Sequence, residues 1–206
     1  MNAKKKIAAI AVAAALAATT AISATLAYFT DAEQKDNVFT VGNVDITLTE
    51  PNWDKEGSVD APKAYPGEAL AKDPTVKNDG ANPCFVRIKV EGWEVLGANN
   101  KITYRTDYVD GKLGDNWELH TDGYFYYDKV LAVGDPTDAL FDQIVIPTSV
   151  TNGFNGSYDL VVKAEAVQAQ GARARFGTGA EGETGTVMTM TVPEIADWFG
   201  TCMPTD

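Results

Sequence analysis

Apolar and polar residues alternate along much of this chain, and a period of two predicts β-strands rather than helices. The clearest case runs from Tyr158 to Gln168, where Leu160, Val162 and Ala164 fall on one face and charged residues fall on the other. Cys84 to Glu91 has the same alternation. Each segment is therefore predicted to be a strand with one face in the core and one face in water.

The segment from Phe39 to Glu50 also alternates, but its phase changes. Phe39 and Val41 share one parity, whereas the apolar residues at 44, 46 and 48 share the other. A straight strand cannot place both sets on one face. The sequence therefore predicts a bulge, a turn or a crossing to another sheet near Gly42.

Two shorter apolar runs, 124–131 and 140–146, are also expected to be strands, and the aromatic residues on both parities of the first predict burial on both sides. Three polar or glycine-rich stretches are expected to be surface loops, namely Pro51 to Gly67, Gly92 to Asn116 and Gly171 to Gly185.

One short helix is predicted near the C-terminus. Thr191 and Glu194 have the spacing of a capping box with Pro193 in the first turn, and apolar residues follow at helical spacing before Gly200. Short strands separated by turn residues indicate an all-β fold, a jelly-roll-like or Ig-like β-sandwich with a short C-terminal helix.

The first residues differ from the rest and are typical of a secretion signal. Three lysines at positions 4–6 precede an uncharged, alanine-rich run, and small residues at Thr25 and Ala27 predict cleavage between Ala27 and Tyr28. A retained membrane anchor is the alternative, because the uncharged stretch is long enough to span a bilayer. The expected organisation is a signal peptide, 1–27, and a single secreted domain, 28–206.

The net charge limits the kinds of molecule that this protein can bind, and its cysteines raise the question of a disulfide. Loss of the three N-terminal lysines leaves 14 basic and 29 acidic residues, a net charge of −15, which disfavours nucleic acid and anionic lipid. Membrane contact is expected only through an uncleaved signal segment. The two cysteines, Cys84 and Cys202, both lie in the exported part, so a disulfide between them is a candidate, with two separate thiols as the alternative.

The sequence offers no recognisable catalytic residues, and no metal or cofactor is expected. The only histidine is His120, which is too few for a zinc protease motif and has no nucleophile motif beside it. With 29 acidic residues, a glycosidase-like pair is neither supported nor opposed. The aspartate-rich turns at 107–110 and 135–138 lack the spacing of an EF-hand and are interpreted as solvated turns.

The junction Ala27-Tyr28-Phe29-Thr30-Asp31, followed by Phe39-Thr40-Val41-Gly42-Asn43-Val44, resembles the start of exported proteins of the TasA/camelysin group. The resemblance covers residues 1 to about 50 and continues more loosely to Val86-Arg87-Ile88. It implies export by a SipW-type signal peptidase from a Gram-positive type of cell, a jelly-roll-like sandwich, and in some members assembly into fibres of a biofilm matrix. Camelysin-like members have also been called metalloproteases, but this sequence lacks recognisable zinc ligands.

Three functions remain in competition. The first is an extracellular, cell-surface matrix protein that polymerises when the segment carrying Tyr28, Phe29, Phe39 and Val41 pairs with a second copy; its alternative is that this strand completes its own sandwich. The second is a monomeric module that binds a glycan or a protein through loop aromatics, Trp53 and Trp93. The third is a camelysin-like metalloprotease.

Overall fold

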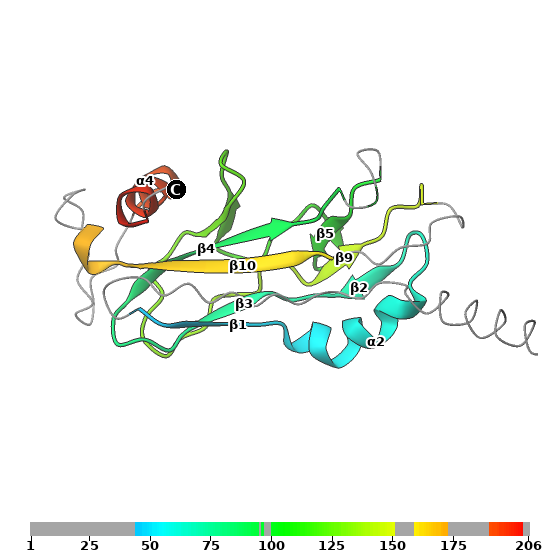
Figure 1. Cartoon of the computed structure of the whole chain (residues 1–206), viewed down its shortest axis with the longest axis horizontal. Coiled ribbons are helices and arrows are strands. Elements are labelled where there is room, and N and C mark those ends of the chain that lie inside the picture. Colours follow the sequence, from blue (N-terminus) through cyan, green and yellow to red (C-terminus); the bar gives the residue numbers. More distant parts are fainter. Residues whose placement is uncertain (1–43, 95, 97–99, 151–158, 173–189, 204–206) are drawn as a thin grey trace, which may run out of the picture.

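The computed structural model describes residues 44–94, 96, 100–150, 159–172 and 190–203 (Figure 1). The strands are β1 (Ile46–Thr49), β2 (Ala69–Ala71), β3 (Thr75–Asn78), β4 (Cys84–Glu91), β5 (Thr103–Thr106), β6 (Val109–Asp110), β7 (Trp117–Leu119), β8 (Phe125–Tyr127), β9 (Gln143–Val145) and β10 (Val161–Gln168). The helical elements are η1 (Trp53–Gly57), α2 (Ser58–Asp60), η2 (Ala61–Lys63) and α4 (Val192–Cys202).

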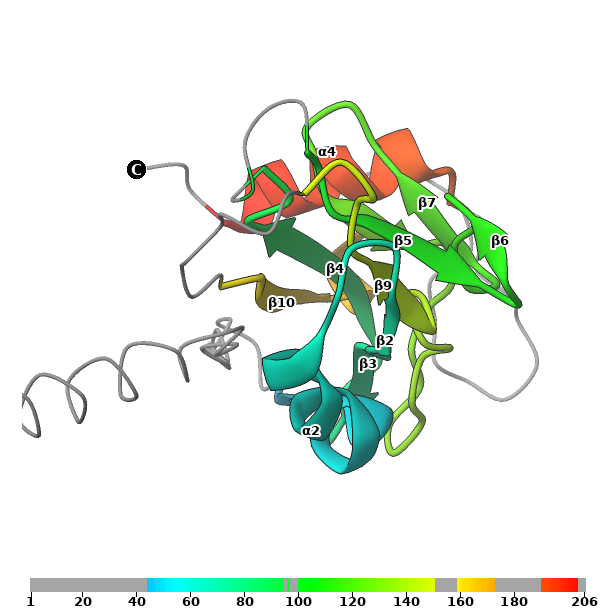
Figure 2. The ribbon, with the colours of Figure 1, turned by 90° about the vertical axis from the view of Figure 1, so that its right-hand side faces the viewer.

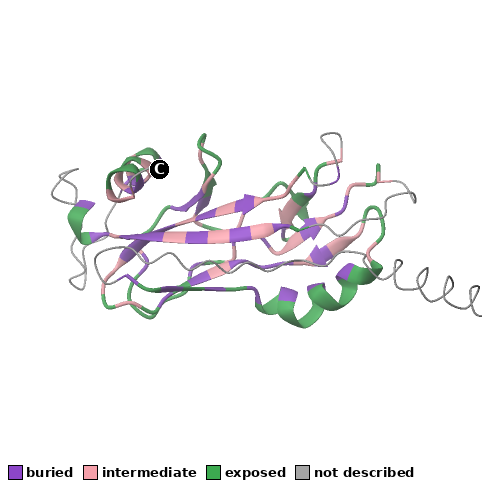
Figure 3. Cartoon of the chain, viewed as in Figure 1, coloured by how far each residue is buried: buried purple, intermediate pink, exposed green. Residues whose placement is uncertain are grey.

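The first sheet contains the two strands that the alternation predicted most clearly. Its order is β10-β4-β8-β7, and all its pairings are antiparallel. β4 and β10 pair along eight residues each, from Cys84 opposite Gln168 to Glu91 opposite Val161. Burial alternates along both strands, as Figure 3 shows. All three residues of β8 are buried, which confirms that this strand is covered on both sides.

The second sheet has the order β2-β9-β5-β6, and β1 pairs with β3 in a short ladder (Figure 2). The inner faces of these strands and of the first sheet share one apolar cluster. Tyr104 of β5 meets Phe125 of β8 edge to face across that cluster, with ring centres 5.9 Å apart. The predicted all-β sandwich is therefore confirmed. The buried residues Ile46 and Leu48 lie on the expected face of β1, and Val44, just before the strand, is buried too.

The C-terminal helix α4 lies over the outer face of the first sheet and has the predicted capping box. The Glu194 carboxylate accepts the backbone N–H of Thr191 at 2.8 Å, and the Thr191 side chain caps the helix in return. Trp198 fixes the helix to the sheet by donating its indole N–H to the Gln168 carbonyl at 2.9 Å. A second apolar cluster, which includes Phe85 and Phe199, fills the space beneath α4. The helix continues past Gly200, the predicted stop, to Cys202.

Two of the predicted loops contain regular structure. The stretch 51–67 holds the consecutive helical turns η1, α2 and η2, and the stretch 92–116 holds the β5–β6 hairpin. Most of the third predicted loop, 171–185, lies outside the described residues. Among the residues that are described, no helix has the length and apolar character needed to cross a bilayer.

Candidate functional site

His120 lies in the turn between β7 and β8 and is paired with a carboxylate. Its Nδ1 is 3.3 Å from Asp122 Oδ1. Asp122 also accepts the Tyr126 hydroxyl at 2.7 Å and the Tyr124 backbone N–H at 3.0 Å. Burial raises the pKa of Asp122, but these three partners outweigh burial and lower it below 3.8. The histidine thus helps to hold a hairpin turn, and within the described residues no serine or cysteine side chain hydrogen-bonds to it.

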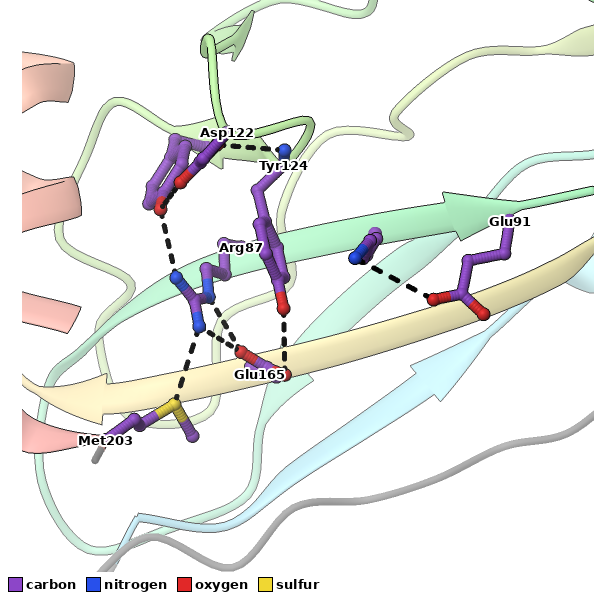
Figure 4. Close-up of polar contacts among 8 residues, drawn as sticks. Arg87, Glu91, Asp122, Tyr124, Glu165 and Met203 are labelled. Carbon is purple, nitrogen blue, oxygen red and sulfur yellow. Dashed lines mark hydrogen bonds and ion pairs between the residues drawn. The ribbon is translucent and has the colours of Figure 1, made fainter. Parts of the chain in front are cut away.

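Arg87, on the outer face of β4, is the centre of a polar cluster shown in Figure 4. Its Nε and Nη2 both donate to Glu165 Oε2 on β10, at 2.7 and 2.6 Å. Its Nη1 donates to the hydroxyl of Tyr126 on β8 at 3.0 Å. Burial opposes the charge of Arg87, but the Tyr126 hydrogen bond and the Glu165 carboxylate outweigh burial and raise its pKa. One guanidinium thus links three neighbouring strands.

The same guanidinium also contacts the C-terminal helix. Its carbon lies 3.9 Å from the centre of the Tyr124 ring and 4.4 Å from that of Phe199 on α4. Its Nη2 lies 3.9 Å from the sulfur of Met203. Because carboxylate, hydroxyl and aromatic partners surround it, Arg87 is positioned to fasten α4 to the sheet rather than to act on a substrate.

A second ion pair on this face is much more exposed. Lys163 Nζ lies 2.9 Å from Glu91 Oε2, and these side chains are 35% and 44% exposed, against 13% and 18% for Arg87 and Glu165. Exposed pairs contribute about 0–1 kcal/mol, whereas removal of one partner from a well-buried pair costs several times more. Lys163 is therefore a matched reference for Arg87.

The structure contradicts the prediction that Trp53 is a binding-loop aromatic. Trp53 is only 5% exposed. Lys72 Nζ lies 4.4 Å from its ring centre and 3.0 Å from Glu50 Oε2, and both charged side chains are almost fully buried. The Asp73 carboxylate accepts the backbone N–H groups of Asn52 and Trp53 at 2.9 and 3.2 Å. The ring therefore covers a buried ion pair and is not offered to a ligand.

Trp93 is not a free platform either. It is half-buried against the main core, with its ring centre 5.7 Å from that of Tyr104 and 6.0 Å from that of Phe141. Because a large apolar ring beside a sandwich is most stable when it packs against the core, part of the Trp93 ring is taken up by that packing, and its role in binding a ligand stays a prediction.

The structure does not contain the predicted disulfide. Cys84 and Cys202 both carry thiols. Cys84 belongs to the cluster between the sheets, whereas Cys202 packs against the cluster beneath α4, on the opposite face of the same sheet. A bridge would have to pass through the strand, which disulfide geometry does not allow. Burial raises the pKa of the Cys84 thiol to about 12.

The sheet edges differ in how they are protected. At β2 the helical segment packs so closely that a Cβ on Gly57 would lie 2.1 Å from the Ala71 carbonyl oxygen. Among the described strands, β1 pairs only with β3, and β10 pairs only with β4. β1 and β10 approach each other, with Cα atoms within 8 Å. The two edges therefore meet on one side of the sandwich.

The remaining predicted site residues lie outside the described residues. These are the cleavage pair Ala27 and Tyr28 and the strand-exchange residues Phe29, Phe39 and Val41. The described part of the chain begins at Val44, shortly before β1. The expected donor segment is thus adjacent in sequence to one of the two meeting edges.

Comparison with known protein families matches the N-terminal part of the chain. The family model described as camelysin metallo-endopeptidase matches residues 2–92. The N-terminal part of this chain is camelysin-like. This finding confirms the resemblance inferred from the junction at Ala27 and from the segment that begins at Phe39. Comparisons with curated proteins and with solved structures returned no significant match.

The description of the camelysin family implies a metal, and the donor atoms of the described residues do not fit one. The sequence has a single histidine and two cysteines, and the cysteines lie on opposite faces of a sheet. Across the described ranges, no three His, Cys, Asp or Glu side chains converge in a way that could hold an ion. We therefore derive no step through a metal.

The sequence analysis missed two features of this chain. It placed Arg87 on the outer face of its strand but had no signal that a helix would cover that face. It treated 107–110 as a solvated aspartate-rich turn, although a tyrosine in the middle of such a turn was a visible anomaly. The structure places that tyrosine, Tyr108, at the tip of the β5–β6 hairpin with 82% of its surface exposed.

Proposed function

We propose that this camelysin-like protein is a secreted structural subunit that assembles into fibres of an extracellular matrix by lending residues 28–41 to a neighbouring copy. The observation that carries the proposal is the meeting of the β1 and β10 edges on one side of the sandwich. A strand placed there gains backbone hydrogen bonds from an edge and buries its apolar side chains against the core.

The phase change favours an added strand over a longer β1. The buried face of β1 carries residues at even positions, whereas Phe39 and Val41 are odd. Because these residues cannot share the inner face of a continuous strand with Ile46, the donor segment has to occupy a different position in the sandwich. If the segment paired within its own copy, it would complete its own fold. If it pairs with a neighbouring copy, as we propose, it makes a polymer.

Secretion belongs to the same proposal. Residues 1–27 act as the signal, a SipW-type peptidase cuts between Ala27 and Tyr28, and the product stays outside a Gram-positive type of cell, at its surface. The partners are the signal peptidase and further copies of the chain, with no nucleic acid. No catalytic step is assigned to it.

The test compares two proteins, one that begins at Tyr28 and one that begins at Asn43, by sedimentation velocity and negative-stain microscopy. The longer protein is expected to form filaments, and the shorter one to remain monomeric. Within the longer protein, Phe39→Asp should block assembly, whereas the matched change Gln34→Asp at a polar position should not. Equal assembly of both lengths would refute strand exchange.

The competing activity is that of a metallo-endopeptidase, and it is favoured only by the family description. Casein cleavage by pure protein that is abolished by a chelator and restored by a divalent metal would establish it. We expect no such cleavage, because the described residues offer no converging ligand set.

A further inference from the structure

The outer face of the second sheet carries a row of side chains that assembly by the β1 and β10 edges does not use. Strand register aligns Ala71, Gln143, Arg105 and Asp110 across all four strands, β2-β9-β5-β6 (Figure 2). With strands about 4.8 Å apart, the row is about 14 Å long. The next residue along β2, Leu70, is buried, so the row faces away from the core.

The polar groups in this row are already oriented. Arg105 Nε donates to Gln143 Oε1 at 2.6 Å, which holds both planar groups side by side. Among the described residues, the terminal nitrogens of Arg105 and the amide nitrogen of Gln143 have no hydrogen-bond acceptor, so they remain available to a ligand. Asp110 is exposed, and Ala69 and Ala71 on β2 carry small, half-buried side chains.

An exposed aromatic ring stands at one end of the row. Tyr108 lies with its ring centre 5.6 Å from the Arg105 guanidinium and is 82% exposed. Its φ is +62°, in the left-handed region that favours glycine, and the preceding Asp107 has φ +51°. The Asp107 backbone N–H donates to the Asp142 carboxylate at 3.0 Å, and the Asp107 carboxylate forms an ion pair with Lys112. Folding alone would be served better by glycine at position 108.

We propose that Tyr108 and the row Asp110–Arg105–Gln143–Ala71 form a binding site for a neutral polysaccharide. The apolar C–H face of a sugar ring packs on an aromatic ring, and sugar hydroxyls pair with planar guanidinium, amide and carboxylate groups in the same plane. This site is separate from the assembly edges. For a matrix subunit it would attach the protein to the glycan that surrounds it, with many weak contacts acting together along a fibre.

Charge selects a neutral ligand. The row itself holds one positive and one negative side chain, and the adjacent Asp107 and Asp142 add negative charge around Lys112. The chain as a whole has a net charge of −12. A polyanionic glycan would be repelled by this surface, whereas a polyhydroxylated neutral chain would not.

The experiment is surface plasmon resonance on protein that begins at Tyr28, with laminarin and galactomannan as neutral probes and polygalacturonate as the anionic probe. At least one neutral probe should bind, and polygalacturonate should not. Tyr108→Gly should weaken binding about tenfold, while its thermal unfolding midpoint stays the same or rises because glycine accepts a positive φ. The matched control is Tyr65→Ala, which removes a tyrosine that is 62% exposed outside the row and should leave binding unchanged.

Several results would overturn the proposal. These are failure of both neutral probes to bind, binding of polygalacturonate alone, and an equal loss of binding in the Tyr108 and Tyr65 variants. If Tyr108→Gly leaves polysaccharide binding intact but changes the oligomeric state in sedimentation, the ring contacts a second copy and the glycan site is wrong. Loss of glycan binding with filaments intact would support this site without bearing on strand exchange.

Discussion

Replacing Arg87 with methionine is the sharpest test of how α4 is held on the sheet. Methionine keeps the apolar stem but removes the guanidinium, so Glu165 and the Tyr126 hydroxyl lose their charged donor. A hydrogen bond to a charged group contributes about 1.5–3 kcal/mol, and a cation over an aromatic ring contributes about 0.5–2 kcal/mol. Since Glu165 is 18% exposed, water recovers part of the loss. We expect Arg87→Met to lower the free energy of unfolding by about 3 kcal/mol.

The assay is urea unfolding followed by tryptophan fluorescence, to which Trp198 on the helix contributes together with the other three tryptophans. The control Lys163→Met removes a cation from the same face of the same sheet, but its pair with Glu91 is exposed, so a loss below about 1 kcal/mol is expected. Adding Glu165→Gln to Arg87→Met should restore part of the lost stability, because it removes the unpaired carboxylate. Equal losses for the Arg87 and Lys163 variants would refute the fastening role.

Three further outcomes follow from the described contacts. Iodoacetamide should modify Cys202 but spare Cys84 in the folded protein, because burial raises the pKa of Cys84 to about 12. In denaturant without reductant, mass spectrometry should find both thiols modified. If neither thiol were modified there, the two cysteines would be joined in a disulfide after all. The lowered pKa of Asp122 means that its carboxylate stabilises the fold above about pH 3.8 and that this stability is lost as the pH falls through the folded pKa. Asp122→Asn should therefore be less stable at neutral pH, and its deficit in urea unfolding should shrink in acid; a constant deficit would contradict this. Gly57→Ala should lower the free energy of unfolding by about 1–3 kcal/mol, because the added Cβ would collide with the Ala71 carbonyl oxygen. An unchanged thermal unfolding midpoint would show that the helical segment moves away from β2 at little cost.

Strands with one solvent-exposed face could be predicted, because the alternation of apolar and polar residues follows from the local geometry of a strand. Val86 to Glu91 alternates without a break, and the structure pairs every residue of β4 with β10. The capping box at Thr191 is equally local, since both of its hydrogen bonds lie within four residues. Features of this kind need no knowledge of the rest of the fold.

The errors arose where a distant partner decides the outcome. Nothing near Trp53 in the sequence indicates that Lys72 and Glu50 form an ion pair beneath its ring. Whether the two cysteines can form a disulfide depends on which face of the sheet α4 covers. The apolar cluster around Phe199 determines that face. The hairpin at Tyr108 was missed because a residue with positive φ and a large side chain does not follow the usual turn preferences.

Strand donation is the central claim of this account, and one binding measurement tests it most directly. A fluorescent peptide of residues 28–42 is titrated into protein that begins at Asn43, after circular dichroism has shown that this protein is folded, and anisotropy is recorded. The account predicts saturable binding of one peptide per protein, a raised unfolding midpoint, and loss of both effects in a peptide carrying Phe39→Asp. A folded protein that binds neither peptide, or binds both equally, would contradict it.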